Sequence, residues 1–283
     1  MSKLLVRLVL GLVFAVFGLL NYCGTVSENP ITGESQRVAL SVQQEIVLGR
    51  QGRQEVAAQF GGLYPNEALQ NYIDQVGQQV VDQSEASSSP YPFEFHLLDA
   101  PETVNAFALP GGQIFITSGL LSRLNSEAQL AGVLGHEVGH VVARHGAEHL
   151  ARRQLGAALV NAIAIASSDN PQNARQTALI AQAVNQLVNL NYSRDDELES
   201  DRLGFQFMTA ADYNPQGIVE LMAILNEAQS GGRSPEFLNT HPNPSNRIAR
   251  LEKLINDSYP NGIPPSLEEG ERDFAQIVQP QLR

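Results

Sequence analysis

The sequence contains no tryptophan, a single cysteine and only six histidines among its 283 residues. One cysteine excludes an intrachain disulfide and any metal site built from several thiolates. Positive charge is also scarce, because 18 Lys and Arg residues stand against 30 Asp and Glu residues, a formal net charge of -12. A nucleic-acid partner is not expected, since binding a phosphate backbone needs a clustered basic surface. Hydrophobic residues make up 43% of the chain, which is typical of a globular protein with a buried core.

Long apolar runs are confined to residues 1–24. Lys3 and Arg7 precede an uninterrupted apolar run at 8–20, which is the arrangement of a signal peptide. The run is shorter than the roughly 20 residues that a spanning helix prefers, but a short retained membrane anchor is an alternative. A third alternative is a lipoprotein signal with cleavage and acylation at Cys23, although Tyr22 does not suit the position before a lipidated cysteine. The rest of the chain is therefore expected outside the cytoplasm, in the periplasm or cell envelope, and attached to the membrane if residues 1–24 are retained or lipidated.

The remaining sequence predicts helices, then a small sheet, then many helices, which is an α+β fold that is mostly α-helical. A linker is expected at 25–40, one domain at 41–257 and a C-terminal tail without an assigned role at 258–283. Apolar periodicity and helix-end signals predict helices at 41–60, 66–83, 126–153, 153–166, 173–190, 194–211, 215–229 and 245–257. Strands are predicted at 93–98 and on both sides of 110–112, and loops at 84–92, 167–171 and 231–244.

The sequence His136-Glu137-Val138-Gly139-His140 lies inside one of these predicted helices. Residues four apart lie on one helical face, so His136 and His140 can bind the same metal ion. Glu137 can then reach a water molecule at that ion. This is the HExxH zinc signature. Imidazole and carboxylate ligands at this spacing favour zinc, and one zinc ion per chain is expected.

A catalytic zinc site takes three protein ligands and leaves one position for water. A further histidine on the same helix is a poor third ligand. His145 would lie about 140° around the helix from His140 and would point elsewhere, as would His149. The third ligand should therefore be a carboxylate from a later helix.

Carboxylates are concentrated at 195–201. Glu197 and Asp201 lie four residues apart on one predicted helical face, so one can bind the metal and the other can support a ligand from outside the coordination sphere. Asp195 and Asp196 lie close by in the sequence and are also candidates for the metal ligand. The spacing alone does not decide among these carboxylates.

Three segments resemble the signature blocks of metallopeptidase family forty-eight, in order and in spacing. They are HEVGHVVARH (136–145), SRDDELESDRLG (193–204) and THPNPSNRI (240–248). This is the gluzincin family that includes the CAAX prenyl protease and HtpX. Residues 105–121 are similar to the strand segment of its soluble, periplasmic branch, that of BepA and LoiP. The resemblance covers roughly residues 40–255. The single apolar run also favours this branch over the members with several membrane helices.

The resemblance implies a gluzincin-type fold with a small β-sheet packed beside the HExxH helix. It implies zinc ligation by His136, His140 and Glu197, catalytic base function for Glu137, and support of a ligand by Asp201.

The segment around His241 is the third candidate element of the site. A histidine in a Pro-rich loop can be an ordinary surface residue. The resemblance instead implies that His241 lies near the zinc, either stabilising the transition state or capping the metal in a resting form. Arg247 would be its structural or catalytic companion.

These assignments predict a zinc-dependent metalloendopeptidase that hydrolyses peptide bonds. An extended substrate is expected along an edge strand near 111–117, held by main-chain hydrogen bonds. The residues predicted to bind it are Gly112, Gln113, Ile114 and Phe115. Such binding favours unfolded or misassembled polypeptides and suits extracytoplasmic protein quality control. The alternative is a latent or inactive zinc-bound scaffold that binds clients in the same groove, as a chaperone does.

Overall fold

The computed structural model describes residues 3–153, 155, 187, 190–230, 235–242 and 247–282. The helix expected up to 166 and the loop expected at 167–171 lie outside these residues, apart from the start of that helix. The helix expected at 173–190 lies almost entirely outside them.

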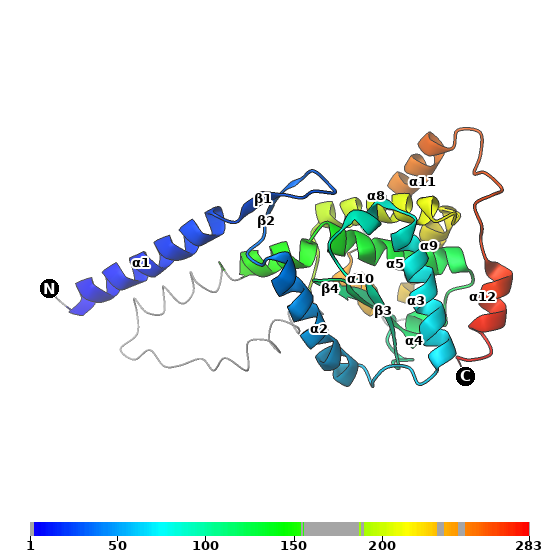
Figure 1. The fold of residues 1–283 in the computed structure, drawn as a ribbon, viewed down its shortest axis with the longest axis horizontal. Helices are drawn as coiled ribbons and strands as arrows, with labels where there is room; N and C mark the ends of the chain where they lie inside the picture. Colours follow the sequence, from blue (N-terminus) through cyan, green and yellow to red (C-terminus); the bar gives the residue numbers. More distant parts are fainter. Residues whose placement is uncertain are drawn as a thin grey trace.

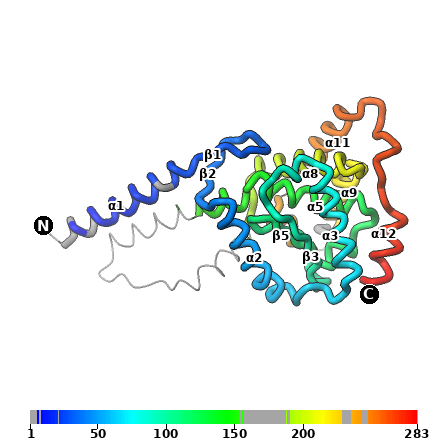
Figure 2. The backbone as a smooth tube through the Cα atoms, viewed as in Figure 1, coloured from blue at the N-terminus to red at the C-terminus, as the bar shows by residue number. Residues whose placement is uncertain are grey.

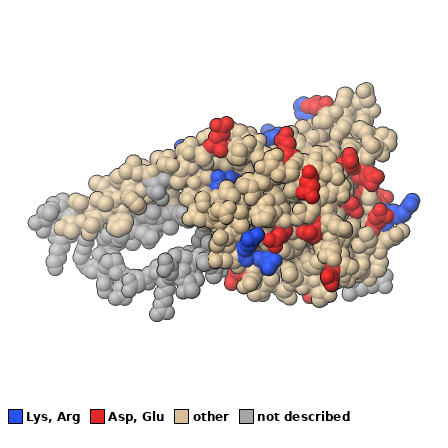
Figure 3. All heavy atoms as spheres, in the orientation of Figure 1, with Lys and Arg blue, Asp and Glu red and all other residues tan. Residues whose placement is uncertain are grey.

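Helix α1 (Lys3–Cys23) projects from the body of the molecule (Figure 1). Several of its apolar side chains are exposed, including Leu12, Phe17 and Leu20. On the face drawn in Figure 3, the described part of α1 shows only uncharged residues, whereas acidic residues are scattered over the body. None of the described helices is long and apolar enough to cross a membrane. The use of this segment as a signal or an anchor stays a prediction.

A β-hairpin lies within the expected linker. Strands β1 (Val26–Glu28) and β2 (Ser35–Arg37) pair in antiparallel fashion. Asn29 Nδ2 donates a 2.8 Å hydrogen bond to the Val142 carbonyl. Gln36 Nε2 donates another to the Ala143 carbonyl. The hairpin thus binds carbonyl groups at the end of the HExxH helix.

The first two helices of the body confirm their predicted positions. Helix α2 (Val42–Gln59) begins at a capping box formed by Ser41 and Gln44. Helix α3 (Glu67–Asp82) buries an apolar stripe that includes Leu69, Ile73, Val76 and Val80. A short 3-10 helix (Glu85–Ser88) lies within the expected loop that follows.

A three-stranded sheet follows, with strands β3 (Glu94–Leu98), β4 (Ala106–Leu109) and β5 (Gln113–Thr117) in the order β3-β5-β4. Strand β5 is parallel to β3 and antiparallel to β4. The turn between β4 and β5 requires glycine, because Gly111 has φ 87° and a Cβ there would lie 2.5 Å from the Glu45 carbonyl oxygen.

The central position of β5 corrects the prediction of an edge strand at 111–117. Its backbone pairs with a neighbour on each side, and the Gly112 carbonyl accepts a 2.9 Å hydrogen bond from Glu94. A substrate therefore cannot add a strand along Gly112, Gln113, Ile114 and Phe115. The alternating sequence predicted the strands but carried no information on their order.

Helix α5 (Glu127–Val142) crosses the middle of the body, and every residue after its first is buried. After the short helix α4 (Ser118–Leu121), Ser126 caps α5 by accepting a 3.2 Å hydrogen bond from Gln129 N. Ser126 and Gln129 form only half of a capping box, because the Gln129 side chain accepts a hydrogen bond from Asn125 N instead of Ser126 N.

Helices α8 (Arg194–Ala210) and α9 (Gln216–Ser230) pack on α5. Glycines permit a close crossing of α5 and α8. A Cβ on Gly204 would lie 2.9 Å from the backbone nitrogen of His136, and one on Gly139 would lie 3.2 Å from Ser200 Cα. This crossing places the carboxylates of α8 beside the HExxH residues.

The prediction of an unbroken helix over 126–153 is wrong. Helix α5 ends at Val142, and helical structure resumes at His145. Arg144 between them has φ 59°, a left-handed conformation that an α-helix cannot contain. Its guanidinium forms an ion pair with the buried Glu45 and donates a 2.8 Å hydrogen bond to the Leu40 carbonyl.

The C-terminal part of the chain lies against the body. Helix α10 (Glu236–Thr240) falls within the expected loop, and α11 (Arg247–Ser258) matches its prediction. The chain then runs down the side of the body to α12 (Glu271–Ile277) (Figure 2). The mostly helical α+β fold is confirmed, and the sheet packs beside α5, chiefly through β4.

Candidate metal centre

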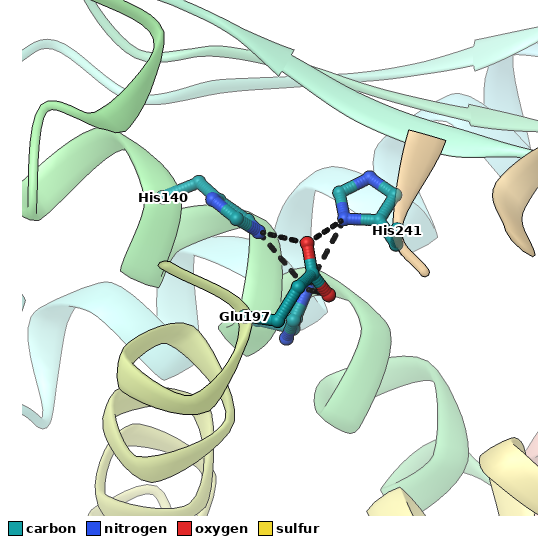
Figure 4. A group of neighbouring side chains, drawn as sticks. His140, Glu197 and His241 are labelled. Atoms are coloured by element: carbon teal, nitrogen blue, oxygen red, sulfur yellow. Dashed lines mark hydrogen bonds and ion pairs between the residues drawn. The ribbon is translucent and has the colours of Figure 1, made fainter. Parts of the chain in front are cut away.

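Four buried side chains from three parts of the chain form one cluster. His136 and His140 come from α5, Glu197 from the first turns of α8, and His241 directly follows α10. One potential ligand atom from each residue lies within 4.8 Å of all the others. Figure 4 shows a carboxylate oxygen of Glu197 between the imidazoles of His140 and His241.

The spacing of these atoms fits four ligands around a tetrahedral metal ion. His136 Nε2 lies 3.1 Å from His140 Nε2 and 3.4 Å from His241 Nδ1. Glu197 Oε1 lies 3.0 Å from His241 Nδ1 and 3.5 Å from His140 Nε2. Ligand atoms held 2.0–2.1 Å from a tetrahedral zinc ion are about 3.3–3.4 Å apart. The residues present therefore fit a metal ion in both donor type and spacing.

The protonation states of two of these residues also suit metal binding. Burial holds the pKa of His140 well below its usual value, so its imidazole is neutral. Burial acts to raise the pKa of Glu197, but His241, His140 and Arg247 outweigh it and hold this pKa well below the usual value. A metal needs a neutral imidazole and an ionised carboxylate.

Glu137 lies beside the cluster and is fully buried. Neither oxygen of its carboxylate has a hydrogen-bond partner among the described residues, and His241 Nε2 is 3.6 Å from Glu137 Oε1. Burial raises the pKa of Glu137 despite the opposing effect of His241. A buried carboxylate with unpaired oxygens and a raised pKa is suited to accept a proton and return it.

Asp201 and Arg247 lie behind the cluster. Asp201 Oδ1 is 3.1 Å from His136 Nδ1. This is an ion-pair distance without the alignment of a hydrogen bond, and it places a carboxylate where metal-binding histidines usually have their outer partner. Arg247 is fully buried and binds Asp201 with two hydrogen bonds of 2.7 and 2.5 Å. Its Nη1 lies 2.8 Å from Glu197 Oε2. No hydrogen bond or ion pair joins Arg247 to His241, so the guanidinium holds the two carboxylates of α8 in place.

Sequence reasoning missed two aromatic residues of the site. Tyr192 stacks on His140, with ring centroids 3.9 Å apart, and Phe237 stacks on His241 at 4.4 Å. The Tyr192 amide also donates a 3.1 Å hydrogen bond to the Thr240 carbonyl, which joins the segment before α8 to the end of α10. No periodic pattern marks either residue, although Tyr192 directly precedes Ser193, the cap of α8.

A pocket lies beside His140, between β4 and the end of α5. It encloses about 220 Å³, part of it open to solvent. Its lining includes Ala108, Leu109, Pro110, His140, Arg144 and Tyr192. Strand β4 therefore contributes to the lining of this pocket, and β5 does not.

The sequence profile of Peptidase family M48 matches residues 67–255. The chain is 31% identical over 239 residues to the beta-barrel assembly-enhancing protease of Escherichia coli (strain K12), covering 82% of this chain and 48% of that protein. It is 30% identical over 233 residues to mitochondrial metalloendopeptidase OMA1 of Schizosaccharomyces pombe, covering 80% of this chain and 65% of that protein. It is 28% identical over 262 residues to mitochondrial metalloendopeptidase OMA1 of Homo sapiens, covering 87% of this chain and 48% of that protein. The chain thus spans about half the length of several curated relatives that it matches.

Proposed function

This chain belongs to Peptidase family M48, and from this premise we propose that it is a zinc-dependent metalloendopeptidase. The observation that carries the proposal is the set of four ligand atoms spaced as around a tetrahedral ion, next to a buried carboxylate with unpaired oxygens. His136, His140 and Glu197 would hold the zinc. When bound, zinc would polarise the scissile carbonyl and lower the pKa of a water molecule to about 7.

The residues of the chain perform the remaining steps. Glu137 takes a proton from the attacking water and later delivers it to the leaving amine. Asp201 orients the ring of His136 through Nδ1, and Arg247 orients Asp201 and neutralises part of the carboxylate charge. We therefore assign Arg247 a positioning role, which its contacts support better than direct stabilisation of the oxyanion.

An extended polypeptide would bind along the outer edge of β4. Among the described residues, none forms a hydrogen bond with that edge from Ala106 to Leu109, whereas β5 is paired on both sides. Main-chain pairing depends on the substrate's backbone more than on its side chains, which supports unfolded or misassembled proteins as substrates. The N-terminal segment supports a location outside the cytoplasm. The name of the Escherichia coli relative, which refers to beta-barrel assembly, supports a part in quality control of the cell envelope.

The test is Glu137→Gln in the whole chain. The variant should bind zinc but cleave an unfolded protein such as casein about 10²–10⁴-fold more slowly, because the proton acceptor is lost. The matched control is Glu94→Gln, which changes a partly exposed carboxylate on β3 that pairs with Arg53. Wild-type cleavage by Glu137→Gln, or cleavage by wild type that a chelator does not abolish, would disprove the mechanism.

His241 supplies the fourth atom of the cluster, which supports a resting state in which its imidazole occupies the water position. His241→Ala should then cleave faster than wild type. A loss of cleavage would instead indicate that His241 stabilises the transition state. Tight binding of an unfolded client without cleavage by either protein would favour the scaffold function.

A further inference from the structure

A second imidazole lies behind His140. His140 directs Nε2 toward the candidate metal position, and its Nδ1 lies on the opposite side of the ring, 3.0 Å from Nδ1 of His145. His145 is 3% exposed. On its other side, Nε2 of His145 lies 3.2 Å from Glu199 Oε2. The three groups form a continuous chain from the cluster to the second turn of α8.

The two histidines of the HExxH motif therefore have different outer partners. A histidine that binds a metal usually donates its other N–H to a carboxylate, a carbonyl or water. His136 has the carboxylate of Asp201 at 3.1 Å. His140 has another imidazole, and the carboxylate of Glu199 comes only after it.

The tautomers along this chain follow from the position of the metal. If His140 binds through Nε2, its proton is on Nδ1, and the atom 3.0 Å away must accept that proton's hydrogen bond. Nδ1 of His145 must then carry no proton, so the proton of His145 is on Nε2, where Glu199 accepts it. Ser200 Oγ lies 3.4 Å from the same Nδ1 of His145, and its hydroxyl can donate to that unprotonated nitrogen as well. Each imidazole N–H thus has an acceptor, and Glu199 is nearer to Nε2 of His145 than Asp196, whose Oδ1 is 3.9 Å away.

We propose that His145, oriented by Glu199, is a positioning residue that fixes the tautomer and the ring orientation of His140 for metal binding. This inference rests on the metal site proposed above. It concerns the strength with which that site holds its ion and not the cleavage reaction itself.

The backbone explains why His145 reaches this position. On an unbroken helix it would point away from His140, but the left-handed residue Arg144 turns the chain between them. The ion pair of Arg144 with Glu45 and the bonds from the β1–β2 hairpin to the Val142 and Ala143 carbonyls hold this turn.

The neighbouring pair of His149 and Asp196 provides a control. His149 Nε2 lies 2.6 Å from Asp196 Oδ2, so this histidine also has a carboxylate of α8 as partner. It forms no hydrogen bond with His140. The same substitution at 145 and at 149 therefore separates a contact with the metal ligand from the general loss of a histidine in this segment.

The experiment measures zinc affinity of the full chain by competition with a chromophoric chelator. His145→Phe keeps an aromatic ring but removes the acceptor, and it should weaken zinc binding about 10- to 100-fold. His145→Asn places an amide oxygen near the position of Nδ1 and should restore most of the affinity. Glu199→Leu should weaken binding, Glu199→Gln should weaken it less, and His149→Phe should leave it within twofold of wild type.

The inference would be overturned if the zinc affinity of His145→Phe were within twofold of wild type. It would also be overturned if His149→Phe lost as much zinc affinity as His145→Phe. If His145→Phe does not fold, long-range proton–nitrogen NMR spectra of the zinc-loaded wild type decide. They should show His140 protonated at Nδ1 and His145 at Nε2 alone, and a proton on His145 Nδ1 would refute the proposal. If both wild type and His241→Ala bind zinc but cleave no protein, the proposed function would be disproved and this inference would still stand.

Discussion

At the scale of single residues, the most unusual group is the carboxylate of Glu137. It is fully buried and has no hydrogen-bond partner in the part of the chain that the structure describes, and burial raises its pKa above the usual 4.5. A general base acts only when deprotonated. As pH falls through this raised pKa, Glu137 gains a proton, so cleavage should decline at a higher pH than an ordinary glutamate would require.

The measurement is the pH profile of kcat/KM, with zinc content determined at each pH. The midpoint of the acidic decline should lie above 4.5 while zinc is still bound. Glu197 and Asp201 should not set this midpoint, because their neighbours hold both pKa values below the usual range. A decline that follows zinc loss at every pH would contradict the assignment of the midpoint to Glu137.

How far the site could be predicted differs from residue to residue. The helical spacing of His136, Glu137 and His140 needed no tertiary information, and the structure brings Glu197, Asp201 and His241 to the same place. Tyr192 and the contact of His145 could not be predicted. The first depends on stacking between distant segments, and the second on the left-handed backbone of Arg144.

At the scale of elements, the site depends on how closely α5 and α8 cross. A Cβ on Gly204 would lie 2.9 Å from the His136 nitrogen and 3.1 Å from its Cα, both backbone atoms that cannot move independently of α5. Gly204→Ala should therefore push α8 away. It should lower the free energy of unfolding by about 1–3 kcal/mol, although alanine is the better helix former, and it should weaken zinc binding.

The measurement is chemical denaturation of the metal-free protein together with zinc titration. Gly146→Ala is the matched control, since its nearest neighbours would be side-chain atoms at 3.4 Å or more, an ordinary contact distance. It should be neutral or slightly stabilising. Wild-type stability and zinc affinity in Gly204→Ala would show that the crossing tolerates the extra carbon.

Element types were more predictable than their arrangement. Periodicity located α2, α3, α5, α8 and α9 but not the short helix α4, and the extended pattern located β3, β4 and β5 but not β1 and β2. Neither pattern encodes which strand is central. Strand β4 comes between β3 and β5 in the sequence, but in the sheet β5 lies between β3 and β4. The same limit applies to the hairpin in the expected linker, whose Asn29 and Gln36 have partners 113 and 107 residues away.

At the scale of the whole molecule, the C-terminal segment completes the core around α5. The Ala128 amide donates a 3.0 Å hydrogen bond to the Glu269 carbonyl. Phe274 is fully buried, with its ring 6.4 Å from that of Tyr72. Tyr72 donates a 2.7 Å hydrogen bond to Glu127, the first residue of α5. One helix therefore carries the candidate ligands at its C-terminal end and the contacts with the tail at its start.

Phe274→Ala should lower the free energy of unfolding by about 3–5 kcal/mol, the usual cost of removing a buried phenylalanine. Because α5 belongs to both regions, we expect a single cooperative transition, seen equally by circular dichroism and by release of zinc to a chelator dye. Phe17→Ala is the matched control, since Phe17 on α1 is 70% exposed, and it should change stability by less than about 0.5 kcal/mol. Loss of the tail contacts without any change in the midpoint of zinc release would mean that the C-terminal segment folds independently of the site.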